Sequence, residues 1–261
     1  MAETGTMTLS DLMIATRQRA DQLPSGYVPS TSNIYFVSDP ELISYINQSY
    51  FELYDLLVQK YGNDYFVAPA LSFSTDGQSF LYPLPDGTLY SGAPAFYKVL
   101  GLDLNLNPIG NDSFITIPPF MFAERNRYSV PNMQAFYGLT NLRYRLQANN
   151  VWFTPTPAAG QVIRMWYVPR LTQLVNLVDI CDGVSGWTEY IIIDAALKMM
   201  QKQESDISVL AAQKVAIIQR IEAAAENRDQ GNPQTVSDTQ SQNWFGSDSG
   251  WGYGSGNGGF K

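Results

Sequence analysis

Two neighbouring stretches near the end of the chain decide the fold: residues 188–204, TEYIIIDAALKMMQKQE, and residues 207–228, ISVLAAQKVAIIQRIEAAAENR. In the first stretch, Ile193, Leu197 and Met200 recur at steps of three and four residues, which is the spacing of one helix face. In the second stretch the corresponding face consists of Leu210, Ile217, Ile221 and Ala224. Its many alanines keep the helix slim, so a partner helix can approach closely. Both stretches are predicted to be helices.

Two further helices are predicted near the N-terminus. Residues 8–11, TLSD, form a capping box, which indicates a helix that ends near Gln22. Residues 38–41, SDPE, place an acid, a proline and a capping-box glutamate at a second helix start. Apolar side chains then recur at steps of three and four until the stop signal Gly62-Asn63, which predicts a helix over residues 40–61.

The middle of the chain has the pattern of a β-rich region. From residue 65 to about residue 172, short β-branched and aromatic runs alternate with Pro, Gly and Asn. Asp76-Gly77 and Asp86-Gly87 are hairpin-turn signals. The predicted strands cover residues 70–74, 79–82, 96–100, 114–117, 143–148, 151–154 and 161–169.

This order of elements predicts an α+β fold. The N- and C-terminal helices form one helical bundle, a β-rich domain is inserted between them, and an extended C-terminal tail follows. The expected divisions are residues 1–64 for the first helices, 65–175 for the β-rich domain, 176–229 for the last helices and 230–261 for the tail.

The tail is rich in Gly, Ser, Asn and Gln, a composition that cannot bury enough surface to fold alone. It is either a flexible end or a segment that docks on a neighbouring protein, and we expect docking. The expected anchors are its aromatic residues Trp244, Phe245, Trp251, Tyr253 and Phe260.

The composition argues against an enzyme. The chain has no histidine and a single cysteine, Cys181, which removes imidazole chemistry and thiolate zinc sites. Outside the low-complexity tail it also lacks the glycine-rich phosphate loops of nucleotide-binding proteins. We expect no catalytic residue, no metal and no cofactor.

The charge balance limits the partners. A net charge of −8 disfavours tight binding of nucleic acid, although an acidic wall can border moving DNA without holding it. Only 15% of the residues are charged, against about 25% in ordinary soluble domains, so we expect contacts with other chains. No apolar run is long enough to span a bilayer and residues 1–8 do not resemble a signal peptide, so we expect a soluble protein made in a cytoplasm.

Three groups of residues leave alternatives open. The acids Asp179, Asp182, Glu189 and Asp194 could form a catalytic carboxylate pair, but acids near a helix start are more often structural. Asp194, on an apolar helix face, is expected to form a structural ion pair. The aromatic residues of the β-rich region could stack on sugars, although core or interface roles are more common. Solvation or subunit pairing is preferred over phosphate binding for Arg125, Arg127, Arg143, Arg145, Arg164 and Arg170.

The two C-terminal stretches also carry a family resemblance. Residues 187–206, WTEYIIIDAALKMMQKQESD, together with residues 211–214 (AAQK) and 222–229 (EAAAENRD), resemble the C-terminal helices of tailed-bacteriophage head-to-tail adaptor proteins, of the podophage-like type. With the two N-terminal helices, the resemblance covers nearly half of the chain. The β-rich region carries no motif of that family.

The resemblance implies a non-enzymatic structural adaptor in the virion, assembled in the host cytoplasm. Such subunits form a homo-oligomeric ring, a dodecamer, beneath the portal protein; the ring extends the DNA channel, touches genomic DNA only transiently during ejection and presents a platform to tail nozzle or fibre proteins. The tail would then reach the portal. The expected ring-packing residues are Leu197, Met200, Leu210, Ile217 and Ile221.

Two other functions compete with the adaptor. One is a carbohydrate-binding or carbohydrate-degrading tail component that uses the aromatic β-rich region and an acid pair. The other is a minor capsid or tail-tube subunit. The position of the protein in an image of the particle would separate these possibilities.

Overall fold

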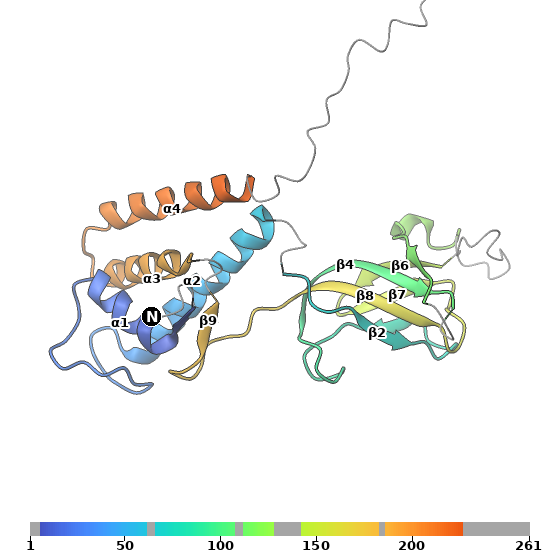
Figure 1. The fold of residues 1–261 in the computed structure, drawn as a ribbon, viewed down its shortest axis with the longest axis horizontal. Helices are drawn as coiled ribbons and strands as arrows, with labels where there is room; N and C mark the ends of the chain where they lie inside the picture. The colour runs from blue at the N-terminus through green and yellow to red at the C-terminus, as the bar shows by residue number, and fades with distance from the viewer. Residues whose placement is uncertain (1–5, 62–65, 108–111, 128–141, 183–185, 227–261) are drawn as a thin grey trace, which may run out of the picture. The chain divides into compact units, whose positions relative to one another are not determined.

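The computed structural model describes residues 6–61, 66–107, 112–127, 142–182 and 186–226 (Figure 1). The chain divides into two units, Met1–Glu226 and Asn227–Lys261, and the second lies outside the described residues. Helices and antiparallel sheets together confirm the predicted α+β class. The helices are α1 (Leu9–Arg19), α2 (Asp39–Lys60), α3 (Thr188–Lys202) and α4 (Ser208–Glu226).

Both ends of the chain supply one helical core. Leu12 of α1, Ile46 and Leu53 of α2, Ile193 of α3 and Ile221 of α4 are all at most 1% exposed and belong to one apolar cluster. Helix α3 packs against each of the other three helices. The apolar spacing in the sequence therefore identified the faces that meet, although the two pairs of helices are more than 120 residues apart.

The predicted capping box starts α1. The Asp11 backbone N–H donates to Thr8 Oγ1 at 3.2 Å, and the Thr8 backbone N–H donates to Asp11 Oδ2 at 3.2 Å. The helix ends at Arg19, three residues before the predicted end, and Asp21 takes a left-handed conformation with φ 53°. Helix α2 agrees with its prediction to one residue at each end.

The start of α2 differs from the prediction in one respect. The N-cap residue is Ser38, whose side chain makes no capping hydrogen bond. The Asp39 carboxylate, expected to serve the helix start, accepts instead from Arg17, Tyr27 and the backbone N–H of Ser30. A cation brought in from α1 binds this carboxylate more strongly than the helix N–H groups do.

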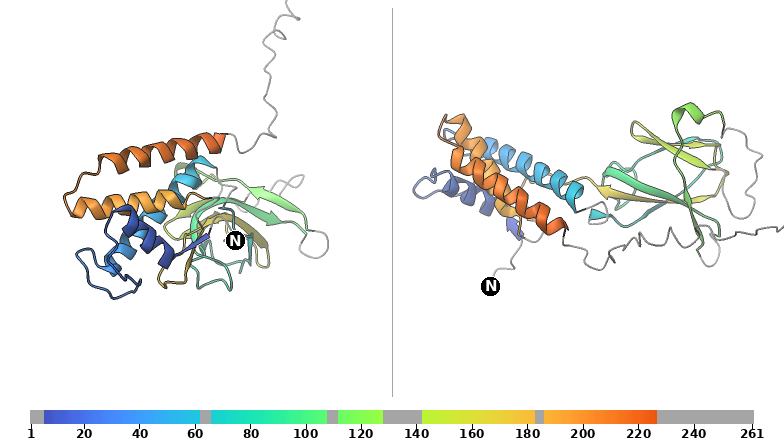
Figure 2. Two further views of the ribbon diagram at one scale, coloured as in Figure 1. Left: turned by 60° about the vertical axis from the view of Figure 1, so that its left-hand side comes forward. Right: turned by 90° about the horizontal axis from the view of Figure 1, so that it is seen from above.

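The β-rich region contains two antiparallel sheets (Figure 2). The first has the order β2 (Leu71–Ser74), β8 (Val162–Pro169), β4 (Phe96–Asn105) and β5 (Phe114–Ile117). The second has the order β3 (Leu81–Pro83), β7 (Asn150–Thr154) and β6 (Arg143–Gln147). Leu102 and Met165 of the first sheet share an apolar cluster with Val151 and Phe153 of the second, so the sheets enclose one core.

The turns were only partly predictable. Gly77 and Gly87 have φ of 76° and 92°, as their turn signals require. A Cβ at Gly77 would also lie 2.7 Å from the backbone nitrogen of Ala159, so only glycine fits there. Neither turn makes a hairpin, however, because β2 pairs with β8 and β3 pairs with β7. A two-residue hairpin joins β6 to β7, and there Ala148 has a positive φ of 49°.

A two-stranded sheet joins the start of the chain to the segment before α3. Strand β1 (Thr6–Thr8) pairs with β9 (Ile180–Asp182), and Met7 faces the buried Cys181. The backbone N–H of Leu9 continues this pairing by donating to Asp179 O at 2.9 Å. The segment that returns from β8 is thereby fixed to the first turn of α1. The sequence pattern did not predict this pairing.

Candidate assembly surfaces

The loop between α1 and α2 is built around a buried cation. Arg17 is 2% exposed and its Nη2 lies 2.7 Å from Oδ1 of Asp39, which is fully buried. Nη2 also donates to the carbonyl of Val37 at 2.8 Å. The guanidinium lies 5.0 Å from the ring centroids of both Tyr27 and Tyr35, so two aromatic faces cover it. One arginine thus contacts the middle of the loop, its last part and the first residue of α2.

This loop presents apolar side chains to the outside. Ile34 is 91% exposed, Val28 is 72% exposed and Phe36 is 66% exposed, and Leu23 and Tyr35 are exposed as well. Lys202 of α3 fixes the end of the loop, since its Nζ donates to the carbonyl of Phe36 at 3.0 Å. The exposed residues therefore belong to a loop with defined contacts.

A charge network joins α2, α3 and α4. Asp194, 1% exposed, lies 2.7 Å from Lys198 Nζ and 2.6 Å from Lys214 Nζ. Both lysines also contact Glu52, at 2.8 and 3.3 Å. Burial opposes ionisation of Asp194, but the hydrogen bonds from Lys198 and Lys214 outweigh it and lower its pKa. The predicted structural ion pair of Asp194 is present, with lysines as the partners.

The other acids of the proposed catalytic group have separate structural roles. Glu189 accepts from Arg19 at 3.0 Å. The carboxylate of Asp179 accepts from the backbone N–H groups of Asn176 and Val175, each at 2.7 Å, which lowers its pKa and closes a turn. The side chain of Asp182 lies outside the described part of the chain. Of the described acids, Glu189 thus forms an ion pair and Asp179 stabilises a backbone turn.

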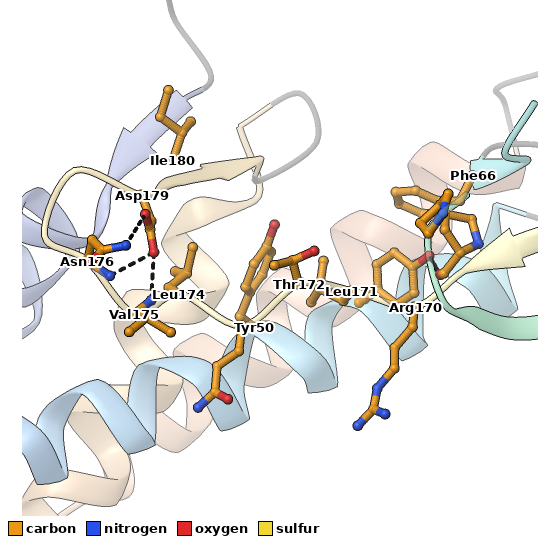
Figure 3. Close-up of a pocket in the computed structure, with 14 residues that line it drawn as sticks. Tyr50, Phe66, Arg170, Leu171, Thr172, Leu174, Val175, Asn176, Asp179 and Ile180 are labelled. Atoms are coloured by element: carbon orange, nitrogen blue, oxygen red, sulfur yellow. Dashed lines mark hydrogen bonds between the residues drawn. The ribbon is translucent and has the colours of Figure 1, made fainter. Parts of the chain in front are cut away.

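An open groove of about 730 Å³ runs between α2 and the segment that leads from β8 to β9 (Figure 3). Tyr50 and Tyr54 of α2 form one wall, and Leu171 and Leu174 of the connecting segment form another. Asp179 is the one acid among the residues that line the groove. An apolar groove with one acid, already used in a turn, suits contact with another chain better than acid–base chemistry.

The residues expected to pack a ring lie in or against the helical core. Leu210, Ile217 and Ile221 of α4 are buried in it, and Leu197 and Met200 of α3 are half-buried against it. The opposite face of α4 is exposed and contains Val209, Ala212, Val215, Ala216 and Ala223. The alanines expected to let a partner helix approach closely include three on this exposed face, Ala212, Ala216 and Ala223.

The β-rich region carries an aromatic surface edged by arginines. Trp152 lies 6.0 Å from the ring of Phe122 and 6.4 Å from that of Phe80, and both phenylalanines are exposed. The guanidinium groups of Arg125 and Arg145 lie 4.5 and 5.5 Å from the Phe122 ring. On the outer face of the other sheet, Arg164 pairs with Asp103 at 3.1 Å and stacks on Phe114.

The remaining arginines show local contacts. Arg127 lies 3.5 Å from Glu124, and Arg170 lines the groove. Arg143 is half-buried in β6 and also interacts with other groups of the chain. Several of the six arginines predicted for solvation or pairing are thus paired or stacked within the chain.

The aromatic residues of the tail lie outside the described residues, so their docking stays a prediction. The predicted anchors concerned are Trp244, Phe245, Trp251, Tyr253 and Phe260. Within the described ranges, the acidic and cysteine side chains form no cluster that could hold a metal ion. None of the helices described there combines the length and apolar character needed to cross a membrane.

Comparison with known proteins adds one finding. The family model described as SU10 adaptor protein matches residues 7–242. The match includes all four helices and both sheets of the β-rich region. A search of the curated proteins found no match.

Proposed function

Because the chain belongs to the SU10 adaptor protein family, we propose that it forms a ring in the neck of a tailed bacteriophage and joins the portal to tail components. The family gives it a structural role as a phage adaptor and a place in the virion. The proposal adds a podophage-like adaptor ring of twelve copies, assembled in the host cytoplasm. In it the portal lies above the ring and a tail nozzle or fibre protein lies below.

The observation that carries this proposal is the amount of apolar surface left exposed on the helical part. The α1–α2 loop and the outer face of α4 both present apolar side chains to solvent. Surfaces of this kind usually mark contacts with other proteins. A subunit that is covered on two sides by its neighbours would bury both, whereas a monomer would leave both in water.

The charge supports a passage for DNA through the ring. A net charge of −8 repels a polyanion, and this repulsion keeps DNA from adhering to a channel that it must leave quickly. Contact between the ring and the genome is then transient and independent of sequence.

The direct test is to combine the purified chain with portal-bearing heads of its phage and to image the particles by cryo-electron microscopy. We expect a ring of density beneath the portal. The proposal fails if the density for this chain lies on the capsid shell, within the tail tube or at the fibre tips.

The tail is proposed to fasten the ring to the portal. Removal of residues 243–261 takes away all five aromatic anchors and leaves the described fold untouched. We expect the truncated chain to keep its far-UV circular dichroism and to add poorly to portal-bearing heads, and Trp251→Ala to show a smaller defect of the same kind. Full addition by the truncated chain would contradict this role.

The aromatic surface around Trp152 keeps a carbohydrate-binding tail component as the second candidate. Exposed rings such as Phe80 and Phe122 are a common platform for sugar stacking. A glycan array separates the two candidates: binding that is lost in Trp152→Ala favours the second, and no binding together with ring-sized particles favours the adaptor.

A further inference from the structure

We infer that the α1–α2 loop of one copy packs against the exposed face of α4 in the next copy, and that repetition of this contact closes the ring. The inference rests on the proposed function and assigns the subunit interface. It joins two surfaces of the same chain that the intrachain core leaves uncovered.

The α1–α2 loop is the first of these surfaces. The ion pair of Arg17 and Asp39 is buried beneath it, while Val28, Ile34 and Phe36 are exposed beside the polar residues Asp21, Ser25, Thr31 and Ser32. Large apolar side chains held in water forgo the stabilisation that burial would give. A surface arranged this way is explained if a partner covers it.

The loop is also held in shape for such a contact. Asn33 Nδ2 donates to the carbonyl of Val28 at 2.9 Å, and the Asp39 backbone N–H donates to the carbonyl of Asn33 at 3.1 Å. At the other end, Lys202 pairs with Glu41 at 2.6 Å and its Nζ lies 5.1 Å from the Phe36 ring centroid. A loop fixed before binding loses little conformational entropy when it docks.

The outer face of α4 is the second surface. A helix at the surface of a protein normally turns charged residues to water, and a helix that is apolar all round is normally buried. Two charged side chains of α4 are exposed among those that the structure describes: Arg220, which lies 5.6 Å from the Trp187 ring centroid, and Glu222, which pairs with Lys60 at 2.7 Å. Ser208 and Gln219 are exposed polar residues of this helix, and the other exposed residues are small or apolar, with Val209 65% exposed and Ala212 and Ala216 beside it.

The two surfaces fit each other in size and in charge. The loop presents large side chains such as Ile34 and Phe36. The surface of α4 is shallow at Ala212 and Ala216, so large side chains can approach the helix backbone there. Beside the loop, Arg17 and Lys202 are already paired within the chain. Asp21 of the loop and Arg220 of the α4 face are exposed and have opposite charges, so the contact would bury apolar area between surfaces whose exposed charges do not repel each other.

Their placement favours a head-to-tail contact. Helix α4 packs on α3 and α2, whereas α1 packs on α3 and α2 without a comparable contact with α4. Figure 1 and the left view of Figure 2 both show α4 along one side of the helices and the α1–α2 loop on the other. Two different patches on opposite sides of a subunit give a heterologous interface, which makes closed rings when the rotation closes.

Cysteine crosslinking tests the contact in the full chain. Cys181 is buried and is replaced by alanine in all variants, which then carry Phe36→Cys together with Ala212→Cys. We expect a disulfide-linked ladder of multimers on mild oxidation of the assembled ring. The matched control combines Phe36→Cys with Gln48→Cys on the exposed face of α2, and it should give no ladder. A disulfide dimer of the Ala212→Cys single variant would instead indicate a two-fold α4–α4 contact and overturn the inference.

Complementation gives a second test that does not depend on oxidation. Ile34→Asp damages the loop surface and Ala216→Glu damages the α4 surface, so each variant alone should need at least about tenfold more protein to assemble. A mixture of the two still contains one intact loop and one intact α4 face. We expect the mixture to form a one-to-one dimer by analytical ultracentrifugation, while Gln48→Glu assembles like the unaltered chain.

The outcomes separate this interface from the proposed function. Rings that persist unchanged in Ile34→Asp and in Ala216→Glu, without the crosslink, overturn the interface and leave the ring standing. An unaltered chain that forms no ring, alone or on portal-bearing heads, overturns both. Circular dichroism must show that each variant is folded; if Ile34→Asp unfolds, Ile34→Ser repeats the loop test.

Discussion

The two charge sites of the helical part differ in how their ions are held. At the α1–α2 loop, one arginine and one aspartate are both at most 2% exposed and are covered by tyrosine rings. Between α2, α3 and α4, Asp194 is just as buried, but its lysine partners are 18% and 26% exposed and share Glu52. The first site is enclosed, and the residues that the structure describes offer its two ions no second partner of opposite charge. The second site is open to water, and its ions share partners.

This difference predicts at which site the removal of one charged side chain destabilises the fold more. A charge that loses its partner inside a closed site stays unpaired and away from water, at a cost of about 3–5 kcal/mol. A charge in an open, shared network keeps a second partner or reaches water, so the loss is smaller. The closed site also shapes the loop inferred to contact the next subunit, so damage there should affect assembly as well as stability.

The largest effect is expected for Arg17→Met. The variant leaves the buried Asp39 carboxylate without its cation and removes the centre of the loop, so the free energy of unfolding should fall by about 3–5 kcal/mol. Urea unfolding followed by circular dichroism measures this loss. The double variant Arg17→Met/Asp39→Asn is the control and should recover part of it, because no charge remains buried. A loss below about 1 kcal/mol would show that the site is open to water.

Asp194→Asn should have the next largest effect, about 2–3 kcal/mol, since Lys198 and Lys214 keep Glu52 as a partner. The lowered pKa of Asp194 predicts how the loss depends on pH. The unaltered chain has this stabilisation above the unfolded pKa, about 3.9, and loses it as the pH falls through the folded pKa. The difference between the two chains should therefore shrink in acid, and a constant difference from pH 7 to pH 2 would contradict the assignment.

Tyr27→Phe probes the closed site from its rim and should cost about 1–2 kcal/mol, through loss of the 2.9 Å hydrogen bond to Asp39. Burial, with the hydrogen bond to Asp39, raises the pKa of Tyr27 to about 12. Its contribution is present below the unfolded pKa, about 10, and is lost as the pH rises through the folded value. The variant should therefore lose less stability than the unaltered chain between pH 10 and 12, and equal losses would argue against this environment.

The smallest effect is expected for Lys60→Met. Its Nζ lies 2.7 Å from Glu222, but the two side chains are 41% and 40% exposed. An exposed pair of this kind contributes about 0.2–1 kcal/mol and is screened by salt. Unfolding in low and high salt should give nearly the same value for the variant and the unaltered chain. A loss of unfolding free energy comparable to that of Asp194→Asn would mean that solvent exposure does not determine how much each ion pair contributes to stability.

Local signals in the sequence predicted the elements well. The capping box at Thr8 and Asp11 and the apolar spacing of α2 depend on residues within a few positions, so the sequence displays them directly. Strand β4 shows the limit: it was predicted to end at residue 100, yet it continues through Gly101 to Asn105. Pairing with β8 and β5 holds those residues extended despite the glycine, and such partners lie far away in the chain.

The candidate interface was less visible than the fold. The apolar stripe of Leu210, Ile217 and Ile221 marked α4 correctly as a packing helix, but it could not tell an intrachain core from a subunit contact. That distinction depends on which faces α2 and α3 have already covered. Ile34 and Phe36 carried no periodic signal, so their exposure became apparent only when the loop was folded around Arg17.

The sequence by itself determined the helices, most strands, the α+β class and the structural role of Asp194, because propensity, capping and periodicity act over one or two turns of chain. Only the tertiary structure decided which sheets the turns connect, that β1 pairs with β9, and that Arg17 closes a site with Asp39. It also decided which apolar faces remain uncovered. These features depend on groups that meet after the chain has folded, and no local pattern of residues records which of them will meet.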